Sequence, residues 1–171
     1  QLVRLETIDA EDEPVATTWF GMLYRGLDVV GDDRSLEDSG PVLHPLPRDG
    51  RFTSVPIPIT ADTSVVYAEA ARIRNPIHTD AAVAEAAGLP GIILQGTATL
   101  AMAVSHVVAE RFEGGMEQVV RIGARFGAMV FMPSTLTLHI GPSIDGTVRF
   151  EVLNPEGDNA IRDGLLTVRT D

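Results

Sequence analysis

The residues best suited to chemistry lie in one stretch, in which Asn75-Pro76-Ile77-His78 precedes a predicted helix. Proline disfavours helical backbone for the residue before it, so Asn75-Pro76 forces a turned chain and places His78 just ahead of the helix. The positive end of that helix favours a neutral imidazole, the form that acts as a general base near neutral pH. Without a partner residue, His78 would be better explained as a loop histidine with local hydrogen bonds.

The partner is Gly96, which lies 18 residues beyond His78 and opens the longest predicted helix. A glycine lets a ligand approach a backbone N–H that has no acceptor inside the helix. Such an N–H stabilises a carbonyl oxygen that gains negative charge. The alternative is a glycine required where a helix and a strand pack closely. Together, His78 and Gly96 predict proton transfer beside a polarised carbonyl.

Two helices are expected to position these residues. Thr79 or Asp80 can cap a short helix over residues 81–87. A longer helix is predicted from Gly96 to about Arg111, and its side chains are apolar nearly all round. Helices of this kind are buried, so we expect the long helix to lie inside the fold.

The last third of the chain shows the alternation of apolar and polar residues that is typical of half-buried strands. Asp145-Gly146, Glu156-Gly157 and Asp163-Gly164 mark turns or bulges between and within the strands. Short connections predict an antiparallel sheet. One long helix followed by such a sheet predicts an α+β fold, in which the sheet wraps around the helix.

The N-terminal residues repeat part of this pattern. Val3-Arg4-Leu5-Glu6 and the hairpin that follows are similar to Val148-Arg149-Phe150-Glu151 and its hairpin. The similarity either reflects duplication or is the alternation that any two hairpins share. On the first interpretation, residues 1–27 are a remnant of a preceding copy, residues 28–54 are a linker, and residues 55–171 form the main domain.

Composition excludes several classes of protein. The chain has 171 residues, enough for one domain with a real core. It has no cysteine and no lysine, which excludes disulfides, thiolate nucleophiles and Schiff-base chemistry. A formal charge of −11 argues against nucleic-acid binding. The four histidines lack metal-ligand spacing, so we expect no metal site, and we expect no cofactor. The absence of a signal peptide or membrane span predicts a cytoplasmic protein.

The spacing resembles the signature of the MaoC-like dehydratases, the (R)-specific enoyl-CoA hydratase group of the hotdog superfamily. In that signature an aromatic residue precedes Ser-Gly-Asp-x-Asn-Pro-x-His, and Ile-x-His-Gly follows about twenty residues later. The matching positions here are Tyr67, Asn75, Pro76, His78, Asp80 and Gly96. The resemblance runs from about residue 55 to the end of the chain.

The resemblance implies a hotdog fold, or the C-terminal part of a double hotdog. It also implies reversible addition of water to an enoyl chain carried as a thioester of CoA or of an acyl carrier protein. His78 would act as acid and base, the Gly96 N–H would hold the thioester oxygen, and Asn75 would orient the loop. The acyl chain would lie along the long helix, against residues such as Met102. The full set of expected substrate-binding residues is Tyr67, Ile73, Arg74, Leu94, Gln95 and Leu100. Hotdog domains pair, which implies a homodimer or pairing with a second hotdog copy.

Two positions depart from the signature. Ile73 replaces the catalytic aspartate, and Gln95 replaces the histidine before the glycine. Three explanations stay open: His78 works alone through water, Glu69 or Asp62 supplies a carboxylate, or this copy is degenerate and binds an acyl chain without turnover. A cyclase or thioesterase would use the same thioester. Arg72 and Arg74 suit the phosphates of CoA or of a phosphopantetheine arm, and equally suit a solvated surface.

Overall fold

The computed structural model describes residues 1–24, 26–32, 34, 43–45, 51–113 and 115–170. The chain divides into two compact units, Gln1–Val42 and Leu43–Asp171. Much of the predicted linker over residues 28–54 lies outside the described residues. β3 begins at Thr53, within the last part of that predicted linker.

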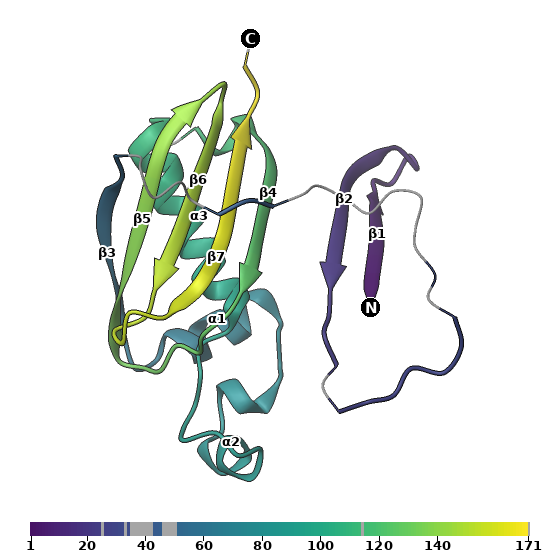
Figure 1. Ribbon diagram of the computed structural model, residues 1–171, viewed down its shortest axis with the longest axis vertical. Helices are drawn as coiled ribbons and strands as arrows, with labels where there is room; N and C mark the ends of the chain where they lie inside the picture. Colours follow the sequence, from purple (N-terminus) through teal and green to yellow (C-terminus); the bar gives the residue numbers. More distant parts are fainter. Residues whose placement is uncertain (25, 33, 35–42, 46–50, 114, 171) are drawn as a thin grey trace. The chain divides into compact units, whose positions relative to one another are not determined.

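The second unit contains a five-stranded antiparallel sheet in the order β3-β5-β6-β7-β4 (Figure 1). The prediction of an antiparallel sheet is therefore confirmed. The strands are β3 (Thr53–Ile59), β4 (Val119–Phe126), β5 (Ser134–Ile144), β6 (Thr147–Leu153) and β7 (Asn159–Val168). The helices are α1 (Thr63–Ala71), η1 (Pro76–His78), α2 (Ala81–Ala86), α3 (Gly96–Arg111) and η2 (Met116–Gln118).

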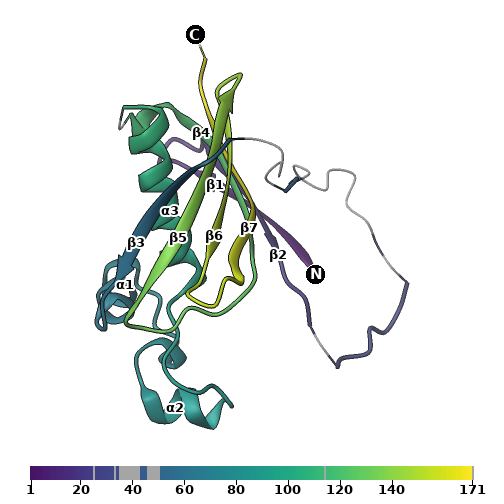
Figure 2. The same cartoon turned by 60° about the vertical axis from the view of Figure 1, so that its left-hand side comes forward.

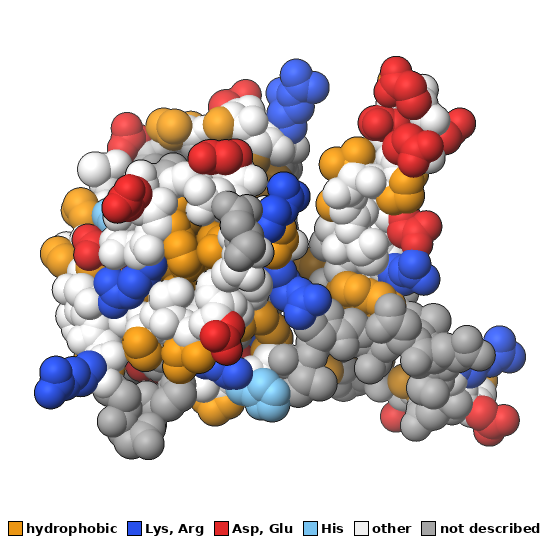
Figure 3. All heavy atoms as spheres, turned by 90° about the horizontal axis from the view of Figure 1, so that it is seen from above, with side chains coloured by type: hydrophobic (Ala, Val, Ile, Leu, Met, Phe, Trp, Pro, Cys, Tyr) orange, Lys and Arg blue, Asp and Glu red, His pale blue; other side chains and the backbone are white. Residues whose placement is uncertain are grey.

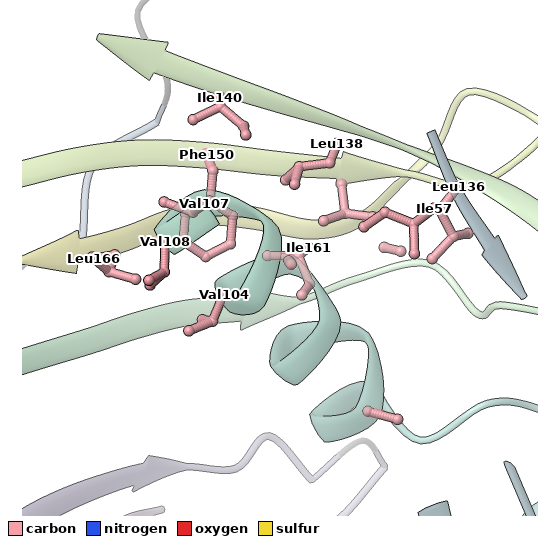
Figure 4. Close-up of a cluster of buried hydrophobic side chains, with 14 of the residues drawn as sticks. Ile57, Val104, Val107, Val108, Leu136, Leu138, Ile140, Phe150, Ile161 and Leu166 are labelled. Atoms are coloured by element: carbon pink, nitrogen blue, oxygen red, sulfur yellow. The ribbon is translucent and has the colours of Figure 1, made fainter. Parts of the chain in front are cut away.

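The core lies between α3 and one face of the sheet (Figure 4). Val104, Val107 and Val108 of α3 pack among side chains such as Phe150 and Leu166 from the strands, all of them buried. These residues follow the helical and strand periods of the sequence, which is why both elements turn their apolar sides to one core. The fold is the predicted sheet around one long helix, the hotdog fold.

The helix α3 is less buried than the sequence predicts. Thr97, Ala101, Ser105 and Ala109 recur along one side of α3, and all four are exposed. These residues are small or weakly polar, so the sequence cannot distinguish an open side from a buried one. The expectation of a helix buried all round is wrong for the residues that the structure describes.

The two edges of the sheet differ. Pro56 and Pro58 lie in the edge strand β3, where proline is tolerated because one side of the strand needs no backbone N–H. The other edge strand, β4, exposes Val120, Ile122 and Phe126. Only the β4 edge therefore combines unblocked backbone with exposed apolar side chains.

Turn signals in the sequence are confirmed. Asp145 and Gly146 both have positive φ in the two-residue turn between β5 and β6. Gly157 also has positive φ between β6 and β7. The pairing of β7 with both neighbours shifts register near Gly164, whose missing side chain leaves room for the Phe150 backbone.

α1 and α2 lie at the end of the sheet where α3 begins, in both views of the ribbon (Figures 1 and 2). The sequence analysis identified α2 but not α1, whose first turn contains Thr63, Val65 and Val66. β-Branched residues have low helix propensity, so the segment carries no strong helical signal. α1 ends at Arg72, which takes the left-handed conformation common after helices.

The first unit contains a hairpin of β1 (Leu2–Ile8) and β2 (Pro14–Gly21). Its turn is acidic and forms the group of red side chains at the tip of the hairpin in Figure 3. Leu5 and Phe20 are exposed on one face of this hairpin, although both are strongly hydrophobic. A two-stranded hairpin is marginally stable in water by itself.

Candidate active site

Local hydrogen bonds shape the loop that carries His78. The Asn75 side chain accepts a hydrogen bond from the Ile77 N–H at 3.4 Å and begins the short helix η1, in which Pro76 takes the first position. Asp80 then caps α2 by accepting from the Ala82 N–H at 2.9 Å and from the next N–H in the chain. The capping by Asp80 is as predicted, and the two caps hold His78 between two helical turns.

The His78 ring is tied to the segment that leads into α3. Its Nδ1 lies 2.8 Å from the carbonyl oxygen of Ile93 and is partly buried. A carbonyl oxygen can only accept, so Nδ1 carries the proton in this bond. In the neutral ring, Nε2 then presents a lone pair and can take a proton from a bound molecule.

The Ile93 segment is itself anchored to the chain beyond β4. Ile93 forms an isolated antiparallel bridge with Phe131, and the Leu94 N–H donates to the Val130 carbonyl at 2.8 Å. Three residues after Ile93, the chain enters α3 at Gly96. The His78 ring is therefore bonded to the anchored segment that enters α3 at Gly96, although 18 residues separate His78 and Gly96 in sequence.

Gly96 is the first residue of α3, so its N–H lacks an acceptor within the helix, and the residue is exposed. A Cβ built on Gly96 would lie 2.8 Å from Cδ1 of Phe126. Phe126, at the end of β4, thus packs directly over this glycine. Both interpretations of Gly96 are compatible with this geometry: the residue allows close packing and leaves a free N–H beside it.

Gln95 caps the start of α3 with its backbone and is almost fully buried. Its side-chain Nε2 donates to the Ser64 carbonyl of α1 at 3.0 Å. Among the described residues, Gln95 Oε1 and Ser64 Oγ are buried without a hydrogen-bond partner. The structure thus places Gln95 as a link between α1 and α3, where the sequence had suggested a substrate contact.

A groove with a cavity of about 330 Å³ lies between α1 and α3. It contains two of the residues expected near the acyl chain, Tyr67 and Met102, while Leu94 lies in the core and Leu100 packs against the core. The lining residues are Thr60, Asp62, Thr63, Val66, Tyr67, Ala70, Ala98, Ala101 and Met102.

The carboxylates considered as replacements have other contacts. Asp62 accepts a hydrogen bond from the Thr60 hydroxyl at 2.6 Å, which lowers the pKa of the Asp62 carboxyl, and its own backbone lowers it further. Glu69 lies 3.9 Å from Arg74, and both side chains are largely exposed. Ile73 is half-buried in the loop after α1. Within the described chain, no hydrogen bond joins a carboxylate to His78.

Among the remaining histidines, His139 has contacts within the sheet rather than with this site. His139 lies 3.1 Å from Glu151 on the neighbouring strand and stacks against Phe52. Among the described residues, no group of three or more His, Asp or Glu side chains is arranged to hold a metal ion. None of the helices in the described ranges has the length and apolar character to cross a membrane.

The fold is that of a hotdog domain, in which a histidine is hydrogen-bonded to the segment that leads into the long helix. The chain belongs to the MaoC like domain family, which matches residues 45–151. It is 32% identical over 107 residues to enoyl-CoA hydratase ChsH3 of Mycobacterium tuberculosis, covering 63% of this chain and 37% of that protein. It is 31% identical over 149 residues to 3-hydroxyacyl-thioester dehydratase Y of the same organism, covering 85% of this chain and 50% of that protein.

Solved structures agree on the fold. A MaoC-like dehydratase from Phytophthora capsici superposes with a TM-score of 0.85 at 22% identity, covering 99% of this chain and 58% of that one. The (R)-hydratase from A. caviae superposes with a TM-score of 0.60 at 19% identity, covering 71% of this chain and 96% of that one. In sequence, the chain spans half or less of the length of the two mycobacterial relatives named above.

Proposed function

We propose that the chain catalyses the reversible addition of water to a trans-2-enoyl thioester. The observation that carries this proposal is the His78 ring, whose Nδ1 is held by the Ile93 carbonyl while Nε2 is left for chemistry. The names of the two mycobacterial relatives, an enoyl-CoA hydratase and a 3-hydroxyacyl-thioester dehydratase, support the same reaction class.

In the proposed reaction, the substrate carbonyl oxygen binds the Gly96 N–H, which draws electron density toward that oxygen. His78 Nε2 takes a proton from water as the water oxygen bonds to C3 of the enoyl chain. The enolate oxygen then carries negative charge, which the N–H at the start of α3 stabilises. The proton on Nε2 passes to C2, so the product is a 3-hydroxyacyl thioester and His78 is regenerated.

This cycle needs only one proton-transfer group. The Ile93 carbonyl fixes the tautomer and orientation of His78, a task that a second catalytic residue performs in other acid–base sites. A neutral carbonyl stabilises the charged ring less than a carboxylate does, so we expect slower turnover than with an Asp–His pair. His78 acting alone thus remains compatible with Ile73 at the signature position.

The test is hydration of trans-2-butenoyl-CoA, followed by the loss of ultraviolet absorbance of the conjugated thioester and by chromatography of the product. We expect 3-hydroxybutyryl-CoA to form with wild-type protein. Release of free CoA would instead indicate a thioesterase. No turnover with any enoyl-CoA would contradict the proposal.

Ile73 favours a second candidate, a degenerate domain that binds acyl thioesters without turnover. This candidate predicts binding of an enoyl-CoA by calorimetry and no hydration. The substitution Ile73→Asp would then create hydration activity, because it restores the carboxylate that the signature contains. A wild-type protein that already hydrates the substrate would refute this candidate.

We also propose that the domain pairs with a second hotdog copy. In the hairpin β1–β2, Leu5 and Phe20 occupy the register positions that Phe150 and Leu166 occupy in β6–β7. Phe150 and Leu166 are fully buried under α3, whereas Leu5 is 53% exposed and Phe20 is 47% exposed. The face of β1–β2 therefore has the chemistry of a hotdog core face without its helix, which supports residues 1–27 as part of another copy.

The exposed apolar side chains of β4 provide a second reason for pairing. Sedimentation velocity tests self-association, with Ile122→Lys on β4 and Val65→Lys on α1 as a matched pair of substitutions of exposed residues. We expect Ile122→Lys to weaken association and Val65→Lys to leave it unchanged. A monomer at all concentrations would contradict pairing between copies of this chain.

A further inference from the structure

The N–H proposed to hold the thioester oxygen belongs to the peptide bond between Gln95 and Gly96. A peptide bond is planar and trans, so the Gly96 N–H points away from the Gln95 carbonyl. Whatever holds Gln95 therefore also fixes the direction of this N–H. The contacts of Gln95 thus bear on any ligand that binds the first residue of α3.

The backbone of Gln95 is held by the first turn of α3. Its carbonyl accepts hydrogen bonds from the Ala98 N–H at 3.0 Å and from the Thr99 N–H at 3.2 Å. The Thr99 hydroxyl lies 3.5 Å from the same oxygen, and Thr99 is buried. These bonds orient the peptide relative to α3, but they do not orient α3 relative to its neighbours.

The side chain of Gln95 connects this peptide to a neighbouring helix. It is only 2% exposed, and its Nε2 donates to the Ser64 carbonyl at 3.0 Å, across 31 residues of sequence. Ser64 lies in the first turn of α1 and is also buried. Toward α3 itself, every residue of which the structure describes, the Gln95 side chain makes no capping bond. Gln95 therefore bonds the end of α3 that begins with Gly96 to α1.

Folding stability alone does not explain a glutamine at this position. Among the polar atoms that the structure describes, Gln95 Oε1 is buried without a hydrogen-bond partner. Burial of an unbonded acceptor destabilises a fold by as much as an ordinary hydrogen bond stabilises it, or by more. A leucine of similar size would fill the space without that cost. A buried polar group that is only partly bonded calls for an explanation other than stability.

Three consecutive residues attach this segment to three different parts of the fold. The Leu94 N–H donates to the Val130 carbonyl at 2.8 Å, and the Gln95 side chain bonds to α1. Phe126, at the end of β4, packs over Gly96. Gln95 is the one of the three whose own side chain makes the hydrogen bond, so a single substitution can remove that bond and leave the other two contacts.

We propose that Gln95 is a positioning residue for the Gly96 N–H: by bonding to α1, its amide sets the direction in which this N–H meets the thioester oxygen. In this role Gln95 acts through the backbone rather than by contact with the ligand. The proposal rests on the proposed function for the identity of the ligand, and it adds the side chain that orients the N–H. A donor fixed before the reaction stabilises the charge that develops on the oxygen, and a displaced donor loses much of this effect.

Gln95→Leu tests the proposal, because leucine keeps a similar volume and removes the donor. In hydration of trans-2-butenoyl-CoA, we expect kcat to fall about 10–100-fold while KM changes little. Loss of an interaction that is made only in the transition state has this signature. Gln95→His restores an N–H donor in the side chain, and we expect it to recover most of the lost kcat.

Arg111→Ala is the matched control for general loosening of α3. Arg111 ties the other end of this helix to the sheet, with side-chain donors to the carbonyls of Gly141 and Ile140 at 3.1 and 3.2 Å. The tether is of the same kind as that of Gln95, but it lies far from Gly96 along the helix. We therefore expect Arg111→Ala to lower Tm and to leave kcat unchanged.

A second measurement reports on the N–H itself and needs no turnover. In an NMR titration of isotope-labelled protein, saturating butyryl-CoA should move the Gly96 amide proton resonance downfield, because the thioester oxygen accepts from this N–H. We expect this shift in wild-type protein and in Gln95→His. In Gln95→Leu we expect a much smaller shift.

An unchanged kcat in Gln95→Leu would overturn the proposal, as would an equal fall in kcat in Arg111→Ala or in Gln95→His. A wild-type Gly96 resonance that does not move with butyryl-CoA would also overturn it, and so would a full shift in Gln95→Leu. Failure of the proposed function would show separately, as absence of hydration of trans-2-butenoyl-CoA by a wild-type protein whose Gly96 resonance still moves.

Discussion

Replacing His78 separates its two contacts, one with the protein and one with the substrate. In His78→Asn, the side-chain nitrogen can occupy the place of Nδ1 and donate to the Ile93 carbonyl, while the Nε2 lone pair is lost. In His78→Ala, both contacts are lost. We expect each variant to lose about 10²–10⁴-fold in kcat, the usual contribution of a general acid–base group.

The loss in rate corresponds to about 2.7–5.5 kcal/mol in activation free energy. The bond to Ile93 is a separate and smaller contribution, about 0.5–1.5 kcal/mol of folding stability for a partly buried group. Thermal unfolding should therefore show a lower Tm for His78→Ala than for His78→Asn, while steady-state hydration assays show similar losses of kcat in both.

The comparison has a clear contrary result. If His78→Asn retains hydration within about threefold of wild type, well below the expected loss, then Nε2 is not the base and His78 has a structural role only. If His78→Asn is as unstable as His78→Ala, then the Ile93 bond does not hold the ring.

Three further predictions concern neighbouring contacts. Gly96→Ala brings a methyl group against Phe126, so we expect a loss in kcat of about 10–100-fold, partly restored in the double variant with Phe126→Ala; an unchanged kcat would show that the packing does not position the N–H. Arg111→Ala removes hydrogen bonds from the end of α3 to acceptors on β3 and β5, which should lower Tm by about 3–8 °C in a thermal scan, and a shift below one degree would refute its role. Thr60→Val removes the hydroxyl that stabilises ionised Asp62, so NMR titration should show the Asp62 pKa rise toward its ordinary value. Because the folded-state pKa of Asp62 is lowered, this bond stabilises the fold at neutral pH and the stabilisation is lost as pH falls through that pKa; an unchanged pKa in Thr60→Val would contradict the assignment.

The amino-acid sequence by itself determined the local features of this protein. Four of these features depend only on neighbours in sequence, and all four are present in the structure. They are the turn at Asn75-Pro76, the Asp80 cap, the two-residue turn at Asp145-Gly146 and the long helix. Alternation of apolar residues also predicts the strands, because side chains on a strand alternate between faces. α1 was missed because its β-branched residues form a helix only in tertiary context.

The tertiary structure decided how these features combine into a site. The bond between His78 and Ile93, the packing of Phe126 over Gly96 and the burial of Gln95 against Ser64 each join residues far apart in the chain. Periodicity and caps carry no information about such contacts, since they depend on strand order and on which face of each helix meets the sheet. For the same reason, only the structure shows that Leu94 lies in the core, that Leu100 packs against it, and that small alanines without a distinguishing pattern line a groove between α1 and α3.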